Sequence, residues 1–261
     1  MRPVLAAGAA LLFLFPLVLM VTGSLRKPGL PPPRGPELLP DPVTVAGYER
    51  AFELVDLGRY AANSLLVAAI AVPLAVLVAS WAGFAISQLP PRHSRALLVL
   101  SFVALMIPTT ALLVPRFAIF KTLGLVDTYV PLVAPALLGM SPFYVVLYWW
   151  SFHRLPRELF DAAHVDGAGP FRQWLSVAMP LVRPVTATVA VLAFVVSWAN
   201  FLDPLLYIFD EDKYTLPLGL RSLAALDRQD LPVLLAGATL ATVPVVIALV
   251  PLHRILRRVA T

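Results

Sequence analysis

Hydrophobic residues in this chain gather into six long apolar blocks, which shorter polar segments separate. A helix that crosses a membrane needs about 20 mainly apolar residues. The blocks predict spans near residues 4–23, 63–87, 97–115, 128–150, 184–206 and 231–252. Prolines such as Pro73, Pro108 and Pro244 interrupt the blocks, and bundled membrane helices tolerate them because neighbouring groups satisfy the freed carbonyls. The pattern therefore predicts an all-α integral membrane protein of six transmembrane helices, with kinks at the prolines.

The composition excludes an ordinary water-soluble domain. Hydrophobic residues make up 59% of the chain and charged residues only 13%, whereas a soluble domain contains about 25% charged residues. The net charge of +5 comes from short basic clusters between the apolar blocks. Such clusters are typical of residues that flank membrane spans, and they form no basic face for nucleic acid. Because the chain has no cysteine, it has no disulfide, thiolate metal site or cysteine nucleophile.

The first block follows Arg2, and a cleaved signal peptide would begin in a similar way. The block is long for such a peptide, and no clear Ala-x-Ala site closes it, so we expect a retained helix over residues 1–24. Residues 25–60 would then be extracytoplasmic, proline-rich at first and an amphipathic surface helix over 45–59. The remaining spans, in residues 61–261, would form the transmembrane core.

Six spans place both chain ends on the same side of the membrane. The segment 88–96 and the tail after Leu252, both expected on that side, contain basic residues and no acidic ones. Cytoplasmic segments carry an excess of Lys and Arg. We therefore expect both termini to lie in the cytoplasm.

The segment 153–183, between the fourth and fifth predicted spans, is too polar to cross a membrane and too patterned to be a linker. Pro156 suits the first turn of a helix, and the Asp-Gly pair at 166–167 is a turn signal. Pro170 can begin a second short helix, which Pro180 would disrupt. The pattern predicts two short helices on the cytoplasmic side.

The side chains on these two helices suit contact with another protein. Glu158 and Asp161 fall in the opening of the first helix, where the helix dipole favours acids. Ala162 and Ala163 are small enough to let a partner surface approach closely. Together with Arg172, the acids can bind polar groups of that partner. The segment therefore has the character of a docking site.

The residues of this segment have the spacing of the EAA loop of ABC-importer permeases, with Asp161-Ala162-Ala163, Gly167, Val177 and Met179-Pro180. That loop usually reads Glu-Ala-Ala, three residues, Gly, nine residues, Ile, one residue, Leu-Pro. In the family it forms coupling helices that insert into a cleft of the ATP-hydrolysing subunit. The resemblance implies that the chain is coupled to partner ATPases through Glu158, Asp161, Ala162, Ala163, Asp166, Gly167, Arg172 and Pro180.

Further short motifs are similar to those of the carbohydrate-uptake branch of these permeases, to which the maltose permease belongs. They are Asn63-Ser64, Ile107-Pro108, Gly124-Leu125, Asp127-Thr128, Pro156, Glu158-Leu159, Asp166-Gly167-Ala168, Trp198, Asn200-Phe201, Pro204-Leu205 and Thr215-Leu216-Pro217. The resemblance implies the six-helix permease fold of type I importers, in the plasma membrane of a bacterium. It also implies a second permease subunit as heterodimer partner, two ABC ATPase subunits and an extracytoplasmic solute-binding protein.

The expected function is translocation of a sugar or oligosaccharide, and a non-sugar solute such as glycerol phosphate is the alternative within the family. The chain contains no G-x-x-x-x-G-K-[ST] phosphate loop. We therefore expect no cofactor on this chain, with ATP and Mg²⁺ bound by the partner subunits. We also expect no catalytic activity of its own.

The sequence disfavours two other classes of function. An ion-coupled secondary transporter would show inverted repeats and polar coupling sites near the middle of the membrane. A membrane enzyme would need paired carboxylates, a metal cluster or a nucleophile with its base. The sequence shows none of these features. No metal site is expected either, because His93, His153, His164 and His253 are scattered between the spans.

Three residues near the end of the fifth block are candidates for lining a sugar path: Trp198, Asn200 and Phe201. An aromatic face can stack on a sugar ring, and an amide can hydrogen-bond to its hydroxyls. Helix packing and an outer gate are the alternative roles. The path assignment therefore depends on where the fold directs these side chains.

Charged residues near the outer boundary have two possible roles. Asp203 is the one acid near the end of an apolar block, and a carboxylate inside a membrane would indicate a functional site. Its place beside Pro204 favours a cap or loop residue instead. Arg116 and Lys121 could attract a phosphate, although basic residues are common at such an interface.

Overall fold

A computed structural model describes residues 2–30, 35, 38–226 and 230–260 of the chain. Every regular element in these residues is a helix, and they contain no β-strand, which confirms the predicted all-α class. The helices form two compact units. Unit 1 comprises Met1–Ser64 with Glu211–Val246, and unit 2 comprises Leu65–Asp210 with Ile247–Thr261. Two long helices, α3 (Leu57–Gln88) and α14 (Leu231–Ala260), contribute residues to both units.

The helices that belong to unit 1 alone are α1 (Arg2–Ser24), α2 (Ala46–Leu54), η4 (Glu211–Lys213) and α13 (Leu216–Leu226). The end of α1 is tied to α2 by a hydrogen bond of 2.7 Å between the hydroxyls of Ser24 and Tyr48. A Cβ added to Gly47 would lie 3.2 Å from the carbonyl oxygens of both Ser24 and Pro232. The lack of a side chain at this glycine therefore lets α2 pack closely on its neighbours.

The amphipathic helix predicted over residues 45–59 is shorter in the structure. Helix α2 ends at Leu54, and Val55 is extended, with φ −146° and ψ 151°. The carboxylate of Asp56 then accepts a hydrogen bond of 3.0 Å from the backbone N–H of Arg59. Because a side-chain oxygen that bonds a first-turn N–H caps a helix, the new helix α3 begins here.

Two motifs that lie far apart in the sequence meet in unit 1. The side-chain amide of Asn63 donates to the carbonyl oxygens of Asp212 and Tyr214, both at 2.9 Å. The hydroxyl of Ser64 accepts a 2.8 Å hydrogen bond from the backbone N–H of Leu216. The pair that opens the second predicted span thus holds the start of α13, which gives Asn63-Ser64 and Thr215-Leu216-Pro217 a shared structural role.

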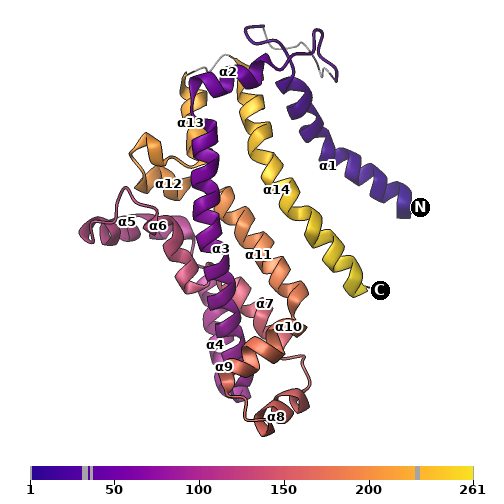
Figure 1. Ribbon diagram of the computed structural model, residues 1–261, viewed down its shortest axis with the longest axis vertical. Coiled ribbons are helices and arrows are strands. Elements are labelled where there is room, and N and C mark those ends of the chain that lie inside the picture. Colours follow the sequence, from indigo (N-terminus) through magenta and orange to yellow (C-terminus); the bar gives the residue numbers. More distant parts are fainter. Residues whose placement is uncertain (1, 31–34, 36–37, 227–229, 261) are drawn as a thin grey trace. The chain divides into compact units, whose positions relative to one another are not determined.

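Unit 2 contains the other helices and carries the candidate sites. They are α4 (Pro91–Leu105), η1 (Thr109–Leu112), α5 (Leu113–Thr122), α6 (Val130–Val133), η2 (Ala134–Leu138), α7 (Pro142–Phe152), α8 (Arg157–Val165), α9 (Pro170–Arg172), η3 (Gln173–Ala178), α10 (Met179–Leu181), α11 (Arg183–Trp198) and α12 (Leu202–Tyr207). Within this unit, α8, α9 and α10 lie at one end, and α5, α6 and α12 lie toward the other (Figure 1).

The core of unit 2 is built on a stripe of small residues along α3. Ala71, Ala75 and Ala79 are fully buried, and Gly83 continues the stripe one turn later. Residues four apart lie on the same face of a helix, and small residues there let two helices approach closely. A Cβ on Gly83 would lie 2.6 Å from the Cβ of Tyr148. Helices α3 and α7 are therefore packed as closely as their backbones allow at this point.

In the described residues, three helices are long and apolar enough to cross a membrane: Leu57–Gln88, Val130–Phe152 and Leu231–Leu249. Two bent pairs raise that number to five if each pair is one span. The pairs are Pro91–Leu105 with Thr109–Thr122, bent by 83°, and Pro170–Leu181 with Arg183–Trp198, bent by 87°. The first predicted span coincides with α1. The count of six spans stays a prediction.

Prolines in the apolar blocks have different effects. Helix α3 continues through Pro73, as expected for a kink. At Pro108 the chain instead leaves the helix, and the predicted span 97–115 is divided between α4, η1 and α5. Proline lacks an N–H and disfavours helical geometry in the residue before it. The sequence predicts a kink at Pro108, and the structure has a break there, with a bend of 83° between Pro91–Leu105 and Thr109–Thr122.

Candidate functional site

The predicted short helix after Pro156 is present as α8, and it ends in a glycine turn. Pro156 itself lies just before the first helical residue. Gly167 has φ +76°, and Ala168 donates its N–H to the carbonyl oxygen of Ala163 at 2.9 Å. A residue with this left-handed conformation commonly terminates a helix, and glycine adopts it without strain. Gly167 is thus needed for the turn that separates α8 from α9.

The second predicted helix begins at Pro170, as expected, and continues past Pro180. Residues Gln173–Ala178 form a π-helical turn, η3, before α10. A π-helical turn is a local departure from the regular i→i−4 pattern, and it precedes the proline that has no N–H to donate. The chain changes direction at Val182, so the break lies two residues beyond the proline.

Aromatic side chains attach this segment to the rest of unit 2. Phe160, the buried residue of α8, has its ring centroid 5.8 Å from that of Phe84 on α3. Trp174 is only 3% exposed and stacks on Trp81 of α3, with ring centroids 5.8 Å apart. Phe171 contacts the edge of the same Trp81 ring at 5.9 Å. Sequence reasoning did not find this cluster, because nothing in the spacing pairs residue 81 with 174.

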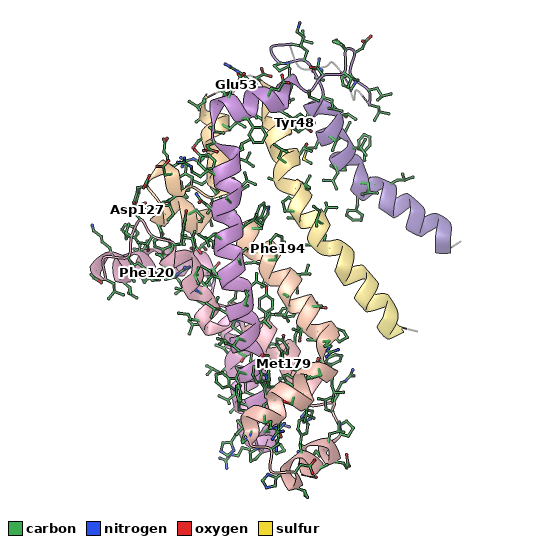
Figure 2. The ribbon with its side chains drawn as sticks, in the orientation of Figure 1. Tyr48, Glu53, Phe120, Asp127, Met179 and Phe194 are labelled. Atoms are coloured by element: carbon green, nitrogen blue, oxygen red, sulfur yellow. The ribbon has the colours of Figure 1, made fainter. Side chains whose placement is uncertain are left out.

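Most of the predicted coupling residues lie on the surface of unit 2. Those that are exposed are Glu158, Asp161, Ala162, Asp166, Gly167, Arg172 and Pro180. Ala163 is half-buried. Val165 exposes 87% of its surface and Phe171 exposes 55%. The segment therefore presents acids and uncovered apolar side chains together, and Figure 2 labels Met179 at this end of the unit.

A small cavity of about 180 Å³ lies next to Asp161. Its wall includes Gln88 at the end of α3, His153 after α7 and Arg157 at the start of α8. The acid of the Asp-Ala-Ala motif therefore borders the junction of three helices. The cavity gives α8 a loosely filled boundary with the helices that support it.

The Asp127-Thr128 motif fastens the loop before α6 to the end of α12. Asp127 has φ +61°, and its backbone N–H donates to the carbonyl oxygen of Tyr207 at 2.7 Å. Its carboxylate accepts from the N–H groups of Phe209 and Asp210, at 3.0 and 3.1 Å. Figure 2 labels Asp127 together with Phe120 at the end of the unit away from Met179. This motif has a structural role.

The structure separates the three candidates for the sugar path. Trp198 is 3% exposed and stacks on Phe194, with centroids 5.6 Å apart. Phe201 is half-buried and precedes α12. Asn200 points to Asp203, donating to its carboxylate at 3.0 Å and accepting from its N–H at 3.3 Å. Asn200 borders a cavity, and the assignment of the three residues to a sugar path stays a prediction.

Asp203 and Arg116 form an ion pair, which sequence reasoning missed. The guanidinium Nη1 lies 3.2 Å from a carboxylate oxygen of Asp203, and the side chains are 25% and 12% exposed. Arg116 also contacts the carbonyl oxygen of Pro131 at 3.4 Å and lies 5.8 Å from the ring centroid of Tyr207. Burial raises the pKa of the Tyr207 hydroxyl above its ordinary value. The charges of Arg116 and Asp203 are therefore paired with each other.

A cavity of about 230 Å³ lies beside this ion pair. Hydroxyl-bearing residues Thr109 and Thr110 of η1 contribute to its wall, and Asn200 closes another side. Leu113 and Met140 add apolar surface. The cavity therefore combines two opposite charges, an amide, hydroxyls and apolar groups.

In the part of the chain that the structure describes, no group of three or more His, Cys, Asp or Glu side chains could hold a metal ion. His153 stacks on Trp149 with ring centroids 5.2 Å apart. The side chain of His253 lies outside the described residues.

Comparison with known proteins relates the chain to a family of membrane transport components. The family "binding-protein-dependent transport system inner membrane component" matches residues 71–260. The arabinooligosaccharides transport system permease protein AraQ of Halalkalibacterium halodurans is 31% identical over 251 residues, which cover 95% of this chain and 89% of that protein. The lactose transport system permease protein LacG of Rhizobium radiobacter is 26% identical over 251 residues, covering 94% and 89%.

Among solved structures, a bacterial ABC transporter involved in the import of the acidic polysaccharide alginate contains a chain of the same fold. The TM-score is 0.78 at 21% sequence identity, and the match covers 97% of this chain and 94% of that one.

Proposed function

The chain belongs to the family of inner membrane components of binding-protein-dependent transport systems, and on this premise we propose that it is a permease subunit of an ATP-driven importer for a sugar or oligosaccharide. The proposal is supported by relatives whose names specify arabinooligosaccharide and lactose transport. Alginate, the cargo of the structural neighbour, is also a polysaccharide. Carbohydrate is the solute class that these proteins share.

The observation that carries the coupling role is the exposed surface of α8 through α10. This surface presents Asp161 and Asp166 beside Val165, which is 87% exposed. Apolar side chains exposed next to charges mark a surface that a partner protein covers. We assign that partner as an ABC ATPase subunit, to which ATP and Mg²⁺ would bind. This chain would then carry out no hydrolysis itself.

The supporting contacts explain how movement of the ATPase would reach the transport core. Helix α8 rests on α3 through Phe160, and η3 rests on α3 through Trp174. Helix α3 in turn packs against α7 so closely at Gly83 that no side chain fits between the two helices. Force on the coupling segment would therefore move the core helices of unit 2 together. Alternation between outward-open and inward-open states would follow from that movement.

The topology that we propose has six spans, with α1 as the first and each bent pair as one crossing. The protein would lie in the plasma membrane of a bacterium. Both termini would be in the cytoplasm, because basic residues flank the cytoplasmic ends of the spans. The complete importer would contain a second permease, two ATPase subunits and an external solute-binding protein. That binding protein would deliver the sugar to the extracytoplasmic side.

Crosslinking tests the coupling role directly, since the chain has no cysteine. Single cysteines would be placed at the exposed positions Ala162 and Asp166, in the complex assembled with candidate partners. We expect both positions to crosslink to the ATPase, in an amount that changes when ATP is added. A cysteine at Thr122, exposed on α5, is the matched control and should form no such crosslink.

Transport in proteoliposomes tests the cargo and the energy source. The assembled complex should accumulate a labelled oligosaccharide only with ATP inside and the solute-binding protein outside. Uptake driven by an ion gradient without ATP would instead indicate a secondary transporter. ATP-dependent uptake of glycerol phosphate, with no uptake of any sugar, would retain the importer and refute the sugar assignment.

A further inference from the structure

We infer that the cavity between η1, α5 and the start of α12 is a subsite that binds hydroxyl groups of an uncharged sugar unit, through Arg116, Asp203, Asn200 and Thr110. This inference rests on the proposed function, because it assigns residues of this chain to the sugar cargo. It goes further by specifying that hydroxyl groups of the cargo are recognised and that the bound sugar unit is uncharged.

The cavity has the size of a subsite and not of a site for a whole oligosaccharide. Its volume is about 230 Å³, below the roughly 300–1,000 Å³ of pockets that enclose drug-sized ligands. Apolar side chains such as Leu113 and Met140 share the wall with the polar groups. A sugar ring likewise has polar edges and apolar faces. One ring, or part of one, is the unit that this cavity suits.

The charged groups in the wall retain hydrogen-bonding capacity after pairing with each other. A guanidinium has five N–H donors, and the contacts of Arg116 with Asp203 and Pro131 engage only some of them. The carboxylate oxygens of Asp203 receive Arg116 and Asn200, while a carboxylate has about four acceptor positions. The cluster can therefore both donate to and accept from a hydroxyl, which is itself a donor and an acceptor.

Burial of this ion pair is energetically unfavourable unless its remaining hydrogen-bond donors and acceptors find partners. Asp203 is 9% exposed as a residue, and ion pairs removed from water gain stability only when further hydrogen bonds satisfy them. In the cavity those partners would be water or cargo hydroxyls. Hydrogen bonds to charged groups are the stronger kind. A sugar hydroxyl can replace the water without loss of these bonds.

The pairing also determines the charge of the preferred cargo. The positive charge of Arg116 and the negative charge of Asp203 cancel, so the cavity wall has no net charge from this pair. A carboxylate on the sugar would have to compete with Asp203 for the guanidinium. An uncharged unit meets no such competition. We therefore expect a neutral sugar to be preferred over a uronic acid.

A purely structural ion pair that links α5 to α12 is the competing explanation, and three variants distinguish the two. Asp203→Asn removes one charge and leaves Arg116 free to bind an acid. The exchange of both residues, Arg116→Asp with Asp203→Arg, restores an ion pair in the reverse orientation. Thr110→Val removes a wall hydroxyl without touching the pair, and Thr122→Val, outside the wall, is its matched control.

The measurement uses the complete complex, first for ATP-dependent uptake of arabinotriose, lactose and raffinose. Saturation-transfer NMR then records the binding of the best-imported of these sugars to the complex without its solute-binding protein. A trisaccharide of alginate, which carries a carboxylate on each ring, competes at equal concentration. Size-exclusion chromatography verifies that each variant is assembled.

We expect Asp203→Asn to weaken neutral sugar binding by about tenfold or more, as for loss of a hydrogen bond to a charged group, and to shift the preference toward the acidic trisaccharide. Thr110→Val should weaken neutral binding by about two- to tenfold, while Thr122→Val has no effect. The charge exchange should assemble and still fail to restore neutral binding.

Two results would overturn the inference while leaving the proposed function intact. One is a wild-type complex that imports sugar, with unchanged binding in both Thr110→Val and Asp203→Asn. The other is full recovery of neutral binding by the charge exchange, which is the outcome for a structural pair. If the Asp203→Asn complex does not assemble, the comparison of neutral sugar binding between Thr110→Val and Thr122→Val tests the inference, and equal binding by these two variants would overturn it. A wild-type complex that imports no sugar refutes the proposed function itself.

Discussion

Replacement of Gly83 by alanine is expected to destabilise unit 2, although alanine is normally the better helix residue. The new Cβ would lie 2.6 Å from the Cβ of Tyr148, 2.8 Å from the backbone nitrogen of Trp149 and 2.9 Å from the carbonyl oxygen of Val145. Two of these three atoms belong to the backbone of α7. A side chain could turn away, but a helix backbone has to be displaced as a whole.

The magnitude follows from two opposing effects. Alanine gains about 1 kcal/mol over glycine in a helix interior. Overpacking a close-packed core costs about 1–3 kcal/mol, and more when backbone atoms are displaced. The contacts at Gly83 are all tighter than 3 Å and mainly to backbone, so the upper part of that range applies. We expect a net loss of roughly 2 kcal/mol in the free energy of unfolding.

The assay is thermal unfolding of the purified complex in detergent, with Gly8→Ala as the matched control. Gly8 also lies inside a helix, but a Cβ added there has nothing within 4 Å. The control should be neutral or slightly more stable, because only the propensity gain remains. Equal stability of Gly83→Ala and Gly8→Ala would show that the contact between α3 and α7 has room for a methyl group at position 83, and would refute this prediction.

Three further substitutions test separate parts of the argument. Ser64→Ala leaves the N–H of Leu216 without its partner and should cost about 1–3 kcal/mol of stability, measured by the same thermal assay. Trp174→Ala removes the stacking on Trp81 and should uncouple ATP hydrolysis from import, with hydrolysis persisting when uptake is lost. Ala162→Trp adds bulk to the proposed docking surface and should abolish co-purification of the ATPase, whereas a partner that still binds would place the contact elsewhere.

The local sequence was sufficient for features that depend on neighbours in the chain. Apolar blocks of the required length predicted the long helices α3 and α14. The turn after α8 followed from Gly167, because a left-handed residue at a helix end favours glycine. The spacing around Asp161 also indicated the family, which the match over residues 71–260 then showed. Each of these depends on side-chain size, polarity or backbone freedom within a few residues.

Only the tertiary structure decided how distant residues combine. Pro73 leaves α3 continuous and Pro108 ends a helix, although both are prolines in apolar blocks, because the outcome depends on the groups that surround the freed carbonyls. The pairing of Arg116 with Asp203 likewise depends on how α5 meets α12. Sequence patterning reports which face of a helix is apolar, but contacts between helices depend on packing geometry that no local property encodes. The contacts of α8 and η3 with α3, and the ion pair in the cavity wall, therefore come from the folded structure and not from any local sequence pattern.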